Sequence, residues 1–181
     1  MNKSLFNLLR SGGYILYAKH GEATIGEDQP NLNLYYCNTQ RNLSEEGRRQ
    51  AIYYGQLFRI LGIPVSYPIL TSPFCRTIET GQLAFGSVNI QIDPFLFQIY
   101  RLSGNLPSAE QKRILDNLHS ELEVIPPQGS NKLIISHSFP KGIGLGEIPD
   151  MGTVIAKPLG QGKGYEMITK LSLEDLANLS R

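Results

Sequence analysis

The feature that most constrains the fold is a short apolar run that ends abruptly in polar residues. Residues 14–18 (Tyr-Ile-Leu-Tyr-Ala) follow two glycines and lead directly into Lys19, His20 and Gly21. A run of this length predicts a β-strand that is covered on both faces, as in an α/β sheet. Open α/β sheets bind their ligands at the carboxyl ends of such strands. The sequence therefore predicts a functional site around His20, where Gly21 lets backbone and ligand come close.

Further segments repeat this alternation of strands with amphipathic helices. Strands are predicted over residues 67–71, 88–92 with a continuation towards 96, 132–136, 153–157 and 165–171. Helices are predicted over residues 4–11, between Ser44 and Gly62, from Ser72 onward, from a capping box at Ser108, and after the N-cap Ser172. This order, with an antiparallel hairpin near the end, predicts an α/β fold. We expect a three-layer α/β/α sandwich whose mixed sheet is largely parallel with an antiparallel end, in one domain spanning residues 1–181.

Composition and charge exclude several functional classes. The formal net charge is +1, so no long-range field favours nucleic acid or anionic membranes as partners. No segment approaches the roughly 20 apolar residues of a membrane span, and no signal peptide is clear, which predicts a cytoplasmic protein. Cys37 and Cys75 form no CxxC motif and are interpreted as unpaired thiols. Nothing in the sequence indicates an oligomeric state.

Two more predicted strands end in polar clusters like the one at His20. The segment Thr71-Ser72-Pro73-Phe74-Cys75-Arg76 ends one strand, and Ser136-His137-Ser138 ends another. Because the carboxyl ends of parallel strands lie along one edge of a sheet, two histidines and two cations are expected to share a crevice. The polar stretch from Lys19 to Leu43 is long for a connection and is expected beside this site.

Together these motifs resemble those of a known family. They are Lys19-His20-Gly21-Glu22, then Thr71-Ser72-Pro73-x-x-Arg76-x-x-Glu79-Thr80, then His137 after an apolar strand. The pattern resembles the histidine phosphatase superfamily, which includes the phosphoglycerate mutases. The resemblance implies a phosphatase that hydrolyses a phosphate monoester without a metal or another cofactor. Its substrate would be a phosphorylated small molecule or a phosphoprotein.

The resemblance also implies roles for the site residues. His20 would attack phosphorus and form a phosphohistidine that water then hydrolyses. Arg76 would grip phosphate oxygens with its guanidinium fork, and His137 would donate a hydrogen bond to the transferring group. Surrounding cations would lower the pKa of His20 and keep its attacking nitrogen free. Contacts to the substrate are expected from four further residues: Gly21, Arg41, Ser72 and Ser138.

Two positions depart from the family pattern. Lys19 stands where the family triplet has arginine, so the charge is kept and the fork is lost. Gln98 aligns with the glutamate that serves many members as general acid, and glutamine cannot donate a proton to the leaving oxygen. Glu147 and Asp93 are the candidates to replace that acid. Glu22 is interpreted mainly as a structural hydrogen-bond acceptor for its loop.

Three alternatives stay open at this point. A phosphomutase would use the same chemistry, although the usual mutase carries a longer insertion than this short chain. A degenerate phosphatase fold that binds a phosphorylated ligand without turnover would account for Lys19 and Gln98. A metal hydrolase built on His20 and His137 would need a carboxylate as third ligand, and no HxH or HExxH spacing supports it.

Overall fold

A computed structural model of the protein describes residues 2–181 and is built on one mixed six-stranded sheet. The strand order is β3-β2-β4-β1-β5-β6. The strands are β1 (Ile15–Lys19), β2 (Ile69–Thr71), β3 (Ile90–Ile92), β4 (Lys132–Ser136), β5 (Thr153–Pro158) and β6 (Tyr165–Leu171). The first four strands are parallel to one another, whereas β5 runs antiparallel to β1 and β6 antiparallel to β5. The predicted fold class is confirmed.

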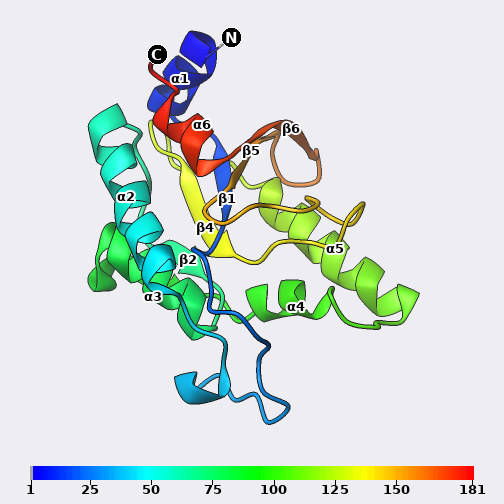
Figure 1. The fold of residues 1–181 in the computed structure, drawn as a ribbon. Helices are drawn as coiled ribbons and strands as arrows, with labels where there is room; N and C mark the ends of the chain where they lie inside the picture. Colours follow the sequence, from blue (N-terminus) through cyan, green and yellow to red (C-terminus); the bar gives the residue numbers. More distant parts are fainter. Residues whose placement is uncertain (1) are drawn as a thin grey trace.

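Helices cover both faces of this sheet (Figure 1). They are α1 (Asn2–Ser11), α2 (Glu45–Leu61), α3 (Cys75–Phe85), α4 (Leu96–Arg101), α5 (Ser108–Leu122) and α6 (Leu173–Ala177). Helices α1, α2, α3 and α6 pack on one face, and α4 and α5 pack on the other. Within residues 2–181, no helix combines the length and the apolar character that crossing a membrane requires.

Strand β1 shows why the sheet is buried on both faces. Leu16 and Ala18 face the core beneath α1, α2, α3 and α6, whereas Ile15 and Tyr17 face the core beneath α4 and α5. All four side chains are at most 1% exposed. Each residue of the strand thus has an apolar environment, which explains the unbroken apolar run in the sequence. Polar groups become possible where the strand ends, at Lys19 and His20.

Local sequence signals set the ends of α2 and α6 as expected. The Ser44 hydroxyl accepts a hydrogen bond from the Gly47 N–H at 3.0 Å, which caps α2. Gly62 ends that helix in the left-handed conformation with φ of 62°. Ser172 and Asp175 form a reciprocal capping box at the start of α6. These helices are therefore specified by residues adjacent to them in sequence.

Three other boundaries differ from the prediction. Helix α3 begins at Cys75 and not at Ser72, because the Ser72 N–H still donates to the Ile135 carbonyl at 3.1 Å and so extends the sheet. Residues 93–96 do not continue β3, because the Asp93 carboxylate accepts the Phe95 N–H and turns the chain into α4. Helix α5 begins at Ser108 without the predicted capping box, and Glu110 pairs with Arg101 at 2.7 Å.

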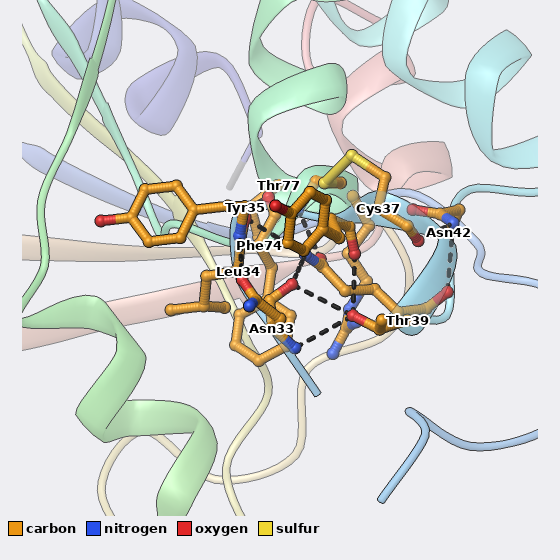
Figure 2. The surroundings of a disulfide bond; sticks show 12 residues. Asn33, Leu34, Tyr35, Cys37, Thr39, Asn42, Phe74 and Thr77 are labelled. Carbon is orange, nitrogen blue, oxygen red and sulfur yellow. Dashed lines mark hydrogen bonds between the residues drawn. A yellow bond between two sulfur atoms is a disulfide. The ribbon is translucent and has the colours of Figure 1, made fainter. Parts of the chain in front are cut away.

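The interpretation of the cysteines as unpaired thiols is wrong. Cys37 and Cys75 form a disulfide with their Cα atoms 5.7 Å apart, and Figure 2 shows the hydrogen-bonded loop residues around it. Residues 20–43, called the 20–43 loop below, fold back so that Cys37 contacts Cys75, which is the first residue of α3. The Gln40 side chain strengthens this contact by accepting the Cys75 N–H at 2.8 Å. Spacing along the sequence carried no sign of this return of the loop.

Candidate active site

The polar clusters at the ends of β1, β2 and β4 meet, as the sequence predicted. Strand β4 lies between β1 and β2, with Lys19 opposite Ser136 and Thr71 opposite Ile135. The residues that follow these strands bring His20, His137 and Arg76 into one buried group, with exposures of 3%, 5% and 3%. The ring centroids of the two histidines are 5.7 Å apart. Two buried imidazoles beside a guanidinium form a site that is suited to bind an anion.

Hydrogen bonds fix the orientation of the His20 ring. Its backbone N–H donates to the Ser136 carbonyl, and its Nδ1 lies 2.7 Å from the Gly21 carbonyl oxygen. Because that oxygen can only accept, Nδ1 carries the proton and Nε2 carries the lone pair. Nε2 in turn accepts from Arg76 Nε at 3.2 Å. The nitrogen expected to attack therefore faces the guanidinium that is expected to hold the phosphate.

Burial and neighbouring cations keep both histidines neutral. Burial, followed by the charge of Arg76 and smaller effects of Lys19 and Arg41, lowers the pKa of His20 to about 3, although the bond to Gly21 opposes this. Burial, and then His20 and the same Arg76 and Lys19 cations, also lowers the pKa of His137 well below its usual value. A neutral imidazole is the form that can act as a nucleophile.

His137 is held by the residues that flank it. Its Nε2 lies 2.8 Å from the Ser72 hydroxyl, and its backbone carbonyl accepts the Tyr17 hydroxyl at 2.8 Å. The Phe74 ring packs edge-on against the imidazole at 4.9 Å between centroids. Ser72 was predicted to contact the substrate, and the structure instead places its hydroxyl on His137. With the hydroxyl donating to Nε2, the proton of a neutral His137 would sit on Nδ1.

Arg76 makes more contacts than any other residue of the site. Its Cζ lies 4.4 Å from the centroid of the Phe74 ring, and its Nε donates to His20. The Nη1 group donates to Asp28 Oδ1 at 2.9 Å and to the Arg41 carbonyl at 3.0 Å. The Nη2 group donates to Asp28 Oδ2 at 3.2 Å. Much of the predicted phosphate fork is therefore occupied by the protein itself.

Asp28 comes from the 20–43 loop and was not predicted from the sequence. Its carboxylate also accepts the Arg41 N–H at 2.8 Å. Burial alone would raise the pKa of Asp28, but the hydrogen bonds from Arg76 and Arg41 outweigh burial and lower it. Asp28 is therefore an anion opposite Arg76. The Tyr100 ring lies nearby, 5.8 Å from Arg76 Cζ and 5.6 Å from the His137 ring.

Lys19 lies at the edge of the site and is paired. Its Nζ donates to Asp150 Oδ1 at 2.6 Å, and the two side chains are 20% and 35% exposed. Asp150 was not predicted to take part in the site. The Lys19 cation is therefore shared with a carboxylate.

Two other predicted contacts have structural explanations. A Cβ on Gly21 would lie 2.5 Å from the Gly47 carbonyl oxygen, so the glycine permits the close approach of α2 to the end of β1. The Ser138 hydroxyl accepts the Ile148 N–H at 2.8 Å and so braces the segment after β4. Arg41 lines a pocket together with Asp28 and Arg76. Its Nη1 donates to the Gly26 carbonyl at 3.2 Å, and its Nε is buried without a hydrogen-bond partner among the described residues.

Glu147 and Asp93, the candidates for a general acid, and Gln98, which aligns with the acid position, make no side-chain hydrogen bond to the two central residues of the site. The exposed Glu147 is fixed through its backbone carbonyl, which accepts a hydrogen bond from Lys170 of the edge strand β6. The Asp93 carboxylate caps the turn before α4. The Gln98 side chain accepts from Arg101 Nη1 at 2.7 Å. In the described part of the chain, none of these three side chains has a hydrogen bond to His20 or Arg76.

Glu22 has the structural role expected for it. Its carboxylate accepts the Ser44 hydroxyl at 2.7 Å, and its backbone N–H donates to the Gln50 side chain at 2.9 Å. These contacts join the end of β1 to the start of α2. The carboxylate therefore serves to fix the loop beside His20.

Comparison with solved structures identifies several that share this fold. At the level of sequence, no family model and no curated protein matches the chain. An alpha-ribazole-5'-phosphate phosphatase from Escherichia coli matches with a TM-score of 0.58 and 15% identity, over 90% of this chain and 97% of that chain. A phosphoserine phosphatase from Entamoeba histolytica matches with a TM-score of 0.56 and 14% identity, over 90% and 98%. A phosphohistidine phosphatase, SixA, from Agrobacterium tumefaciens matches with a TM-score of 0.52 and 15% identity, over 88% and 98%.

These similar structures are histidine phosphatases with phosphoglycerate mutase-like folds. The resemblance that the three strand-end motifs indicated is thus confirmed at the level of the fold. At these identities, the similarity shows the fold alone, and the activity must be argued from the site.

Proposed function

We propose that the protein is a phosphatase that hydrolyses a phosphate monoester through a phosphohistidine on His20. One observation carries this proposal: the neutral His20 points Nε2 at Arg76 Nε, 3.2 Å away, within a buried cationic site. Because Nε2 carries no proton, it can attack phosphorus once the Arg76 Nε–H turns from this nitrogen to an oxygen of the bound phosphate. An unprotonated nitrogen beside a group that binds phosphate oxygens is what in-line phosphoryl transfer requires. The histidine phosphatase fold provides this arrangement at the ends of parallel strands.

The reaction takes place in two steps. First, Nε2 of His20 forms a bond to phosphorus while the ester P–O bond breaks, and the leaving oxygen takes a proton from solvent. Arg76 and Lys19 stabilise the negative charge on the equatorial oxygens during this transfer. Water then attacks the phosphohistidine, the N–P bond breaks, and inorganic phosphate leaves with His20 restored. The Nδ1–H of His137 is the proposed donor to the phosphoryl group.

The chain's own cations supply the charge that this chemistry needs, so we propose no metal and no cofactor. Among residues 2–181, no three His, Cys, Asp or Glu side chains cluster in the way metal ligands do. The alternative of a ligand-binding protein without turnover gains one specific observation, because Asp150 pairs with Lys19 at the position of the family arginine. Turnover therefore has to be measured directly.

The substrate is proposed as a class: a phosphorylated small molecule or a phosphoprotein. The similar structures include phosphatases named for alpha-ribazole phosphate, phosphoserine and phosphohistidine, which share the phosphate and little else.

A cytoplasmic location stays a prediction from the sequence. The disulfide argues for an oxidising compartment, since disulfides are rare in the cytosol.

The decisive experiment combines turnover with trapping of the intermediate. Hydrolysis of 4-nitrophenyl phosphate is measured with and without a chelator, and labelled substrate is used to trap the phosphoenzyme under alkaline quenching, which preserves phosphohistidine. His20→Ala should abolish both signals, whereas His119→Ala, at an exposed position of α5, should abolish neither. Loss of activity in chelator would support a metal hydrolase. Ligand binding without turnover would support the binding protein.

A further inference from the structure

Asp28 has no part in the reaction proposed above, yet its ion pair with Arg76 is more buried than the pair of Lys19 with Asp150. Its side chain is 10% exposed and that of Arg76 is 4% exposed. Both carboxylate oxygens accept from the guanidinium, Oδ1 from Nη1 and Oδ2 from Nη2. Bidentate contacts of this kind fix the plane of an arginine as well as its position.

The N–H groups of Arg76 that the protein leaves free determine where a phosphate must approach. A guanidinium has five N–H groups, and the protein accepts four of them through His20, Asp28 and the Arg41 carbonyl. The remaining N–H is on Nη2. A phosphoryl group attacked by His20 Nε2 lies beside that atom. It meets the edge formed by Nε and Nη2 when the Nε–H changes its acceptor from His20 Nε2 to a phosphoryl oxygen. Asp28 occupies the other edge, formed by Nη1 and Nη2.

The loop backbone closes this arrangement. The Arg41 N–H donates to Asp28 Oδ1 and the Arg41 carbonyl accepts from Arg76 Nη1, so the loop grips both partners of the ion pair. The Phe74 ring packs against the guanidinium, with its centroid 4.4 Å from Arg76 Cζ. Without the carboxylate, Arg76 would be a buried cation without its partner, able to rotate about its last side-chain bonds.

We propose that Asp28 is a positioning residue, which holds the Nη1/Nη2 edge of Arg76 so that the Nε/Nη2 edge faces the phosphoryl group on His20. Its effect on catalysis rests on the proposed function, whereas its effect on anion binding does not. The carboxylate acts through Arg76 and takes no part in bond making. The long 20–43 loop therefore contributes to the site by orienting a residue of α3.

The test compares Asp28→Asn with Glu27→Gln. The second variant removes a charge from the neighbouring exposed residue, which forms no ion pair with residues 5–181. In Asp28→Asn the amide keeps the shape of the carboxylate, but its NH2 group faces an N–H group of Arg76 and cannot accept from it. We expect kcat/KM for 4-nitrophenyl phosphate to fall about 10- to 100-fold and the affinity for tungstate, a phosphate analogue, to fall about tenfold. Glu27→Gln should change neither by more than about threefold.

A double-mutant cycle separates positioning from a general structural role. In the Arg76→Ala background, Asp28→Asn should change kcat/KM by less than about twofold, because the group through which it acts is gone. An equal loss in both backgrounds, or unchanged or tighter tungstate binding in Asp28→Asn, would overturn the proposal. If the wild-type protein bound tungstate without hydrolysing any ester, the proposed function would fail. Weaker tungstate binding by Asp28→Asn would still support the positioning role.

Discussion

Lys19 Nζ lies 2.6 Å from Asp150 Oδ1, so the cation next to the candidate nucleophile is already paired. Lysine has one cationic nitrogen. Because that nitrogen is paired with Asp150, it attracts a phosphate less strongly than an unpaired cation would. Arginine could bind the carboxylate with one edge and a phosphate oxygen with the other. We therefore expect Lys19 to bind a phosphate oxygen more weakly than an arginine would at this position.

We predict that Lys19→Arg raises catalytic efficiency. The gain comes from one added charge-assisted hydrogen bond to the phosphoryl oxygens, worth about 1.5–3 kcal/mol, so an increase in kcat/KM of at least about tenfold is expected. Initial rates with 4-nitrophenyl phosphate measure it. Lys19→Met serves as the control for loss of charge and should lower kcat/KM. An unchanged or lower rate in Lys19→Arg would mean that the pocket is adapted to lysine.

The second prediction concerns stability at acidic pH. The pKa of His20 is about 3 in the folded protein, against about 6.5 in an unfolded chain. The unfolded state therefore binds the extra proton first, and stability is lost as the pH falls from about 6.5 towards 3. Over the step from pH 7 to pH 5, this one histidine should account for about 2 kcal/mol of the loss in the free energy of unfolding.

Urea denaturation at both pH values measures this term. His20→Asn removes the titrating ring, so its free energy of unfolding should fall by about 2 kcal/mol less than that of the wild type over the same step. His137 contributes in the same direction, because its pKa is also lowered by burial. Equal losses in wild type and His20→Asn would show that His20 is not held neutral in the folded protein.

The third prediction concerns the disulfide. Cys37 and Cys75 are 38 residues apart in sequence, and a link over such a length stabilises a fold by about 2–4 kcal/mol, largely through the unfolded chain. The double variant Cys37→Ser, Cys75→Ser should lose this amount in urea denaturation. Dithiothreitol should lower the stability of the wild type to that of the variant and leave the variant unchanged. No response of the wild type to dithiothreitol would mean that the thiols are not linked.

The parts of the site that could be predicted from sequence are those encoded by neighbouring residues. A buried strand followed by His20 or His137 is a local pattern, and parallel pairing then brings the two ends together. Asp28 and Cys37 gave no such signal, because their partners Arg76 and Cys75 are reached only when the 20–43 loop folds back. A loop without periodic apolar residues does not reveal which of its side chains will turn inward.

The boundary between β3 and α4 was mispredicted for a different reason. The prediction continued β3 towards residue 96, whereas the turn capped by Asp93 begins the helix α4 there. In that helix Gln98 is held by Arg101, and Tyr100 is the residue near the site, its ring 5.6 Å from that of His137. A change from strand to helix alters which residues share a face, so the sequence pattern did not indicate that Tyr100 would lie beside His137. The alignment of Gln98 with the general acid stays a prediction.

The last prediction concerns the leaving group. The Asp93 and Gln98 side chains are hydrogen-bonded elsewhere, the exposed Glu147 makes no side-chain hydrogen bond to His20 or Arg76, and Asp28 is kept ionised by Arg76. Without a general acid an alkoxide departs slowly, whereas a phenolate departs without help. General acid catalysis contributes about 10²–10⁴-fold, so we expect aryl phosphates to be cleaved at least about a hundredfold faster than glycerol phosphate. A series of esters should show rates that fall steeply as the pKa of the leaving group rises. A flat series would require a proton donor, and Tyr100→Phe and Asp150→Asn would then identify it by restoring the steep dependence.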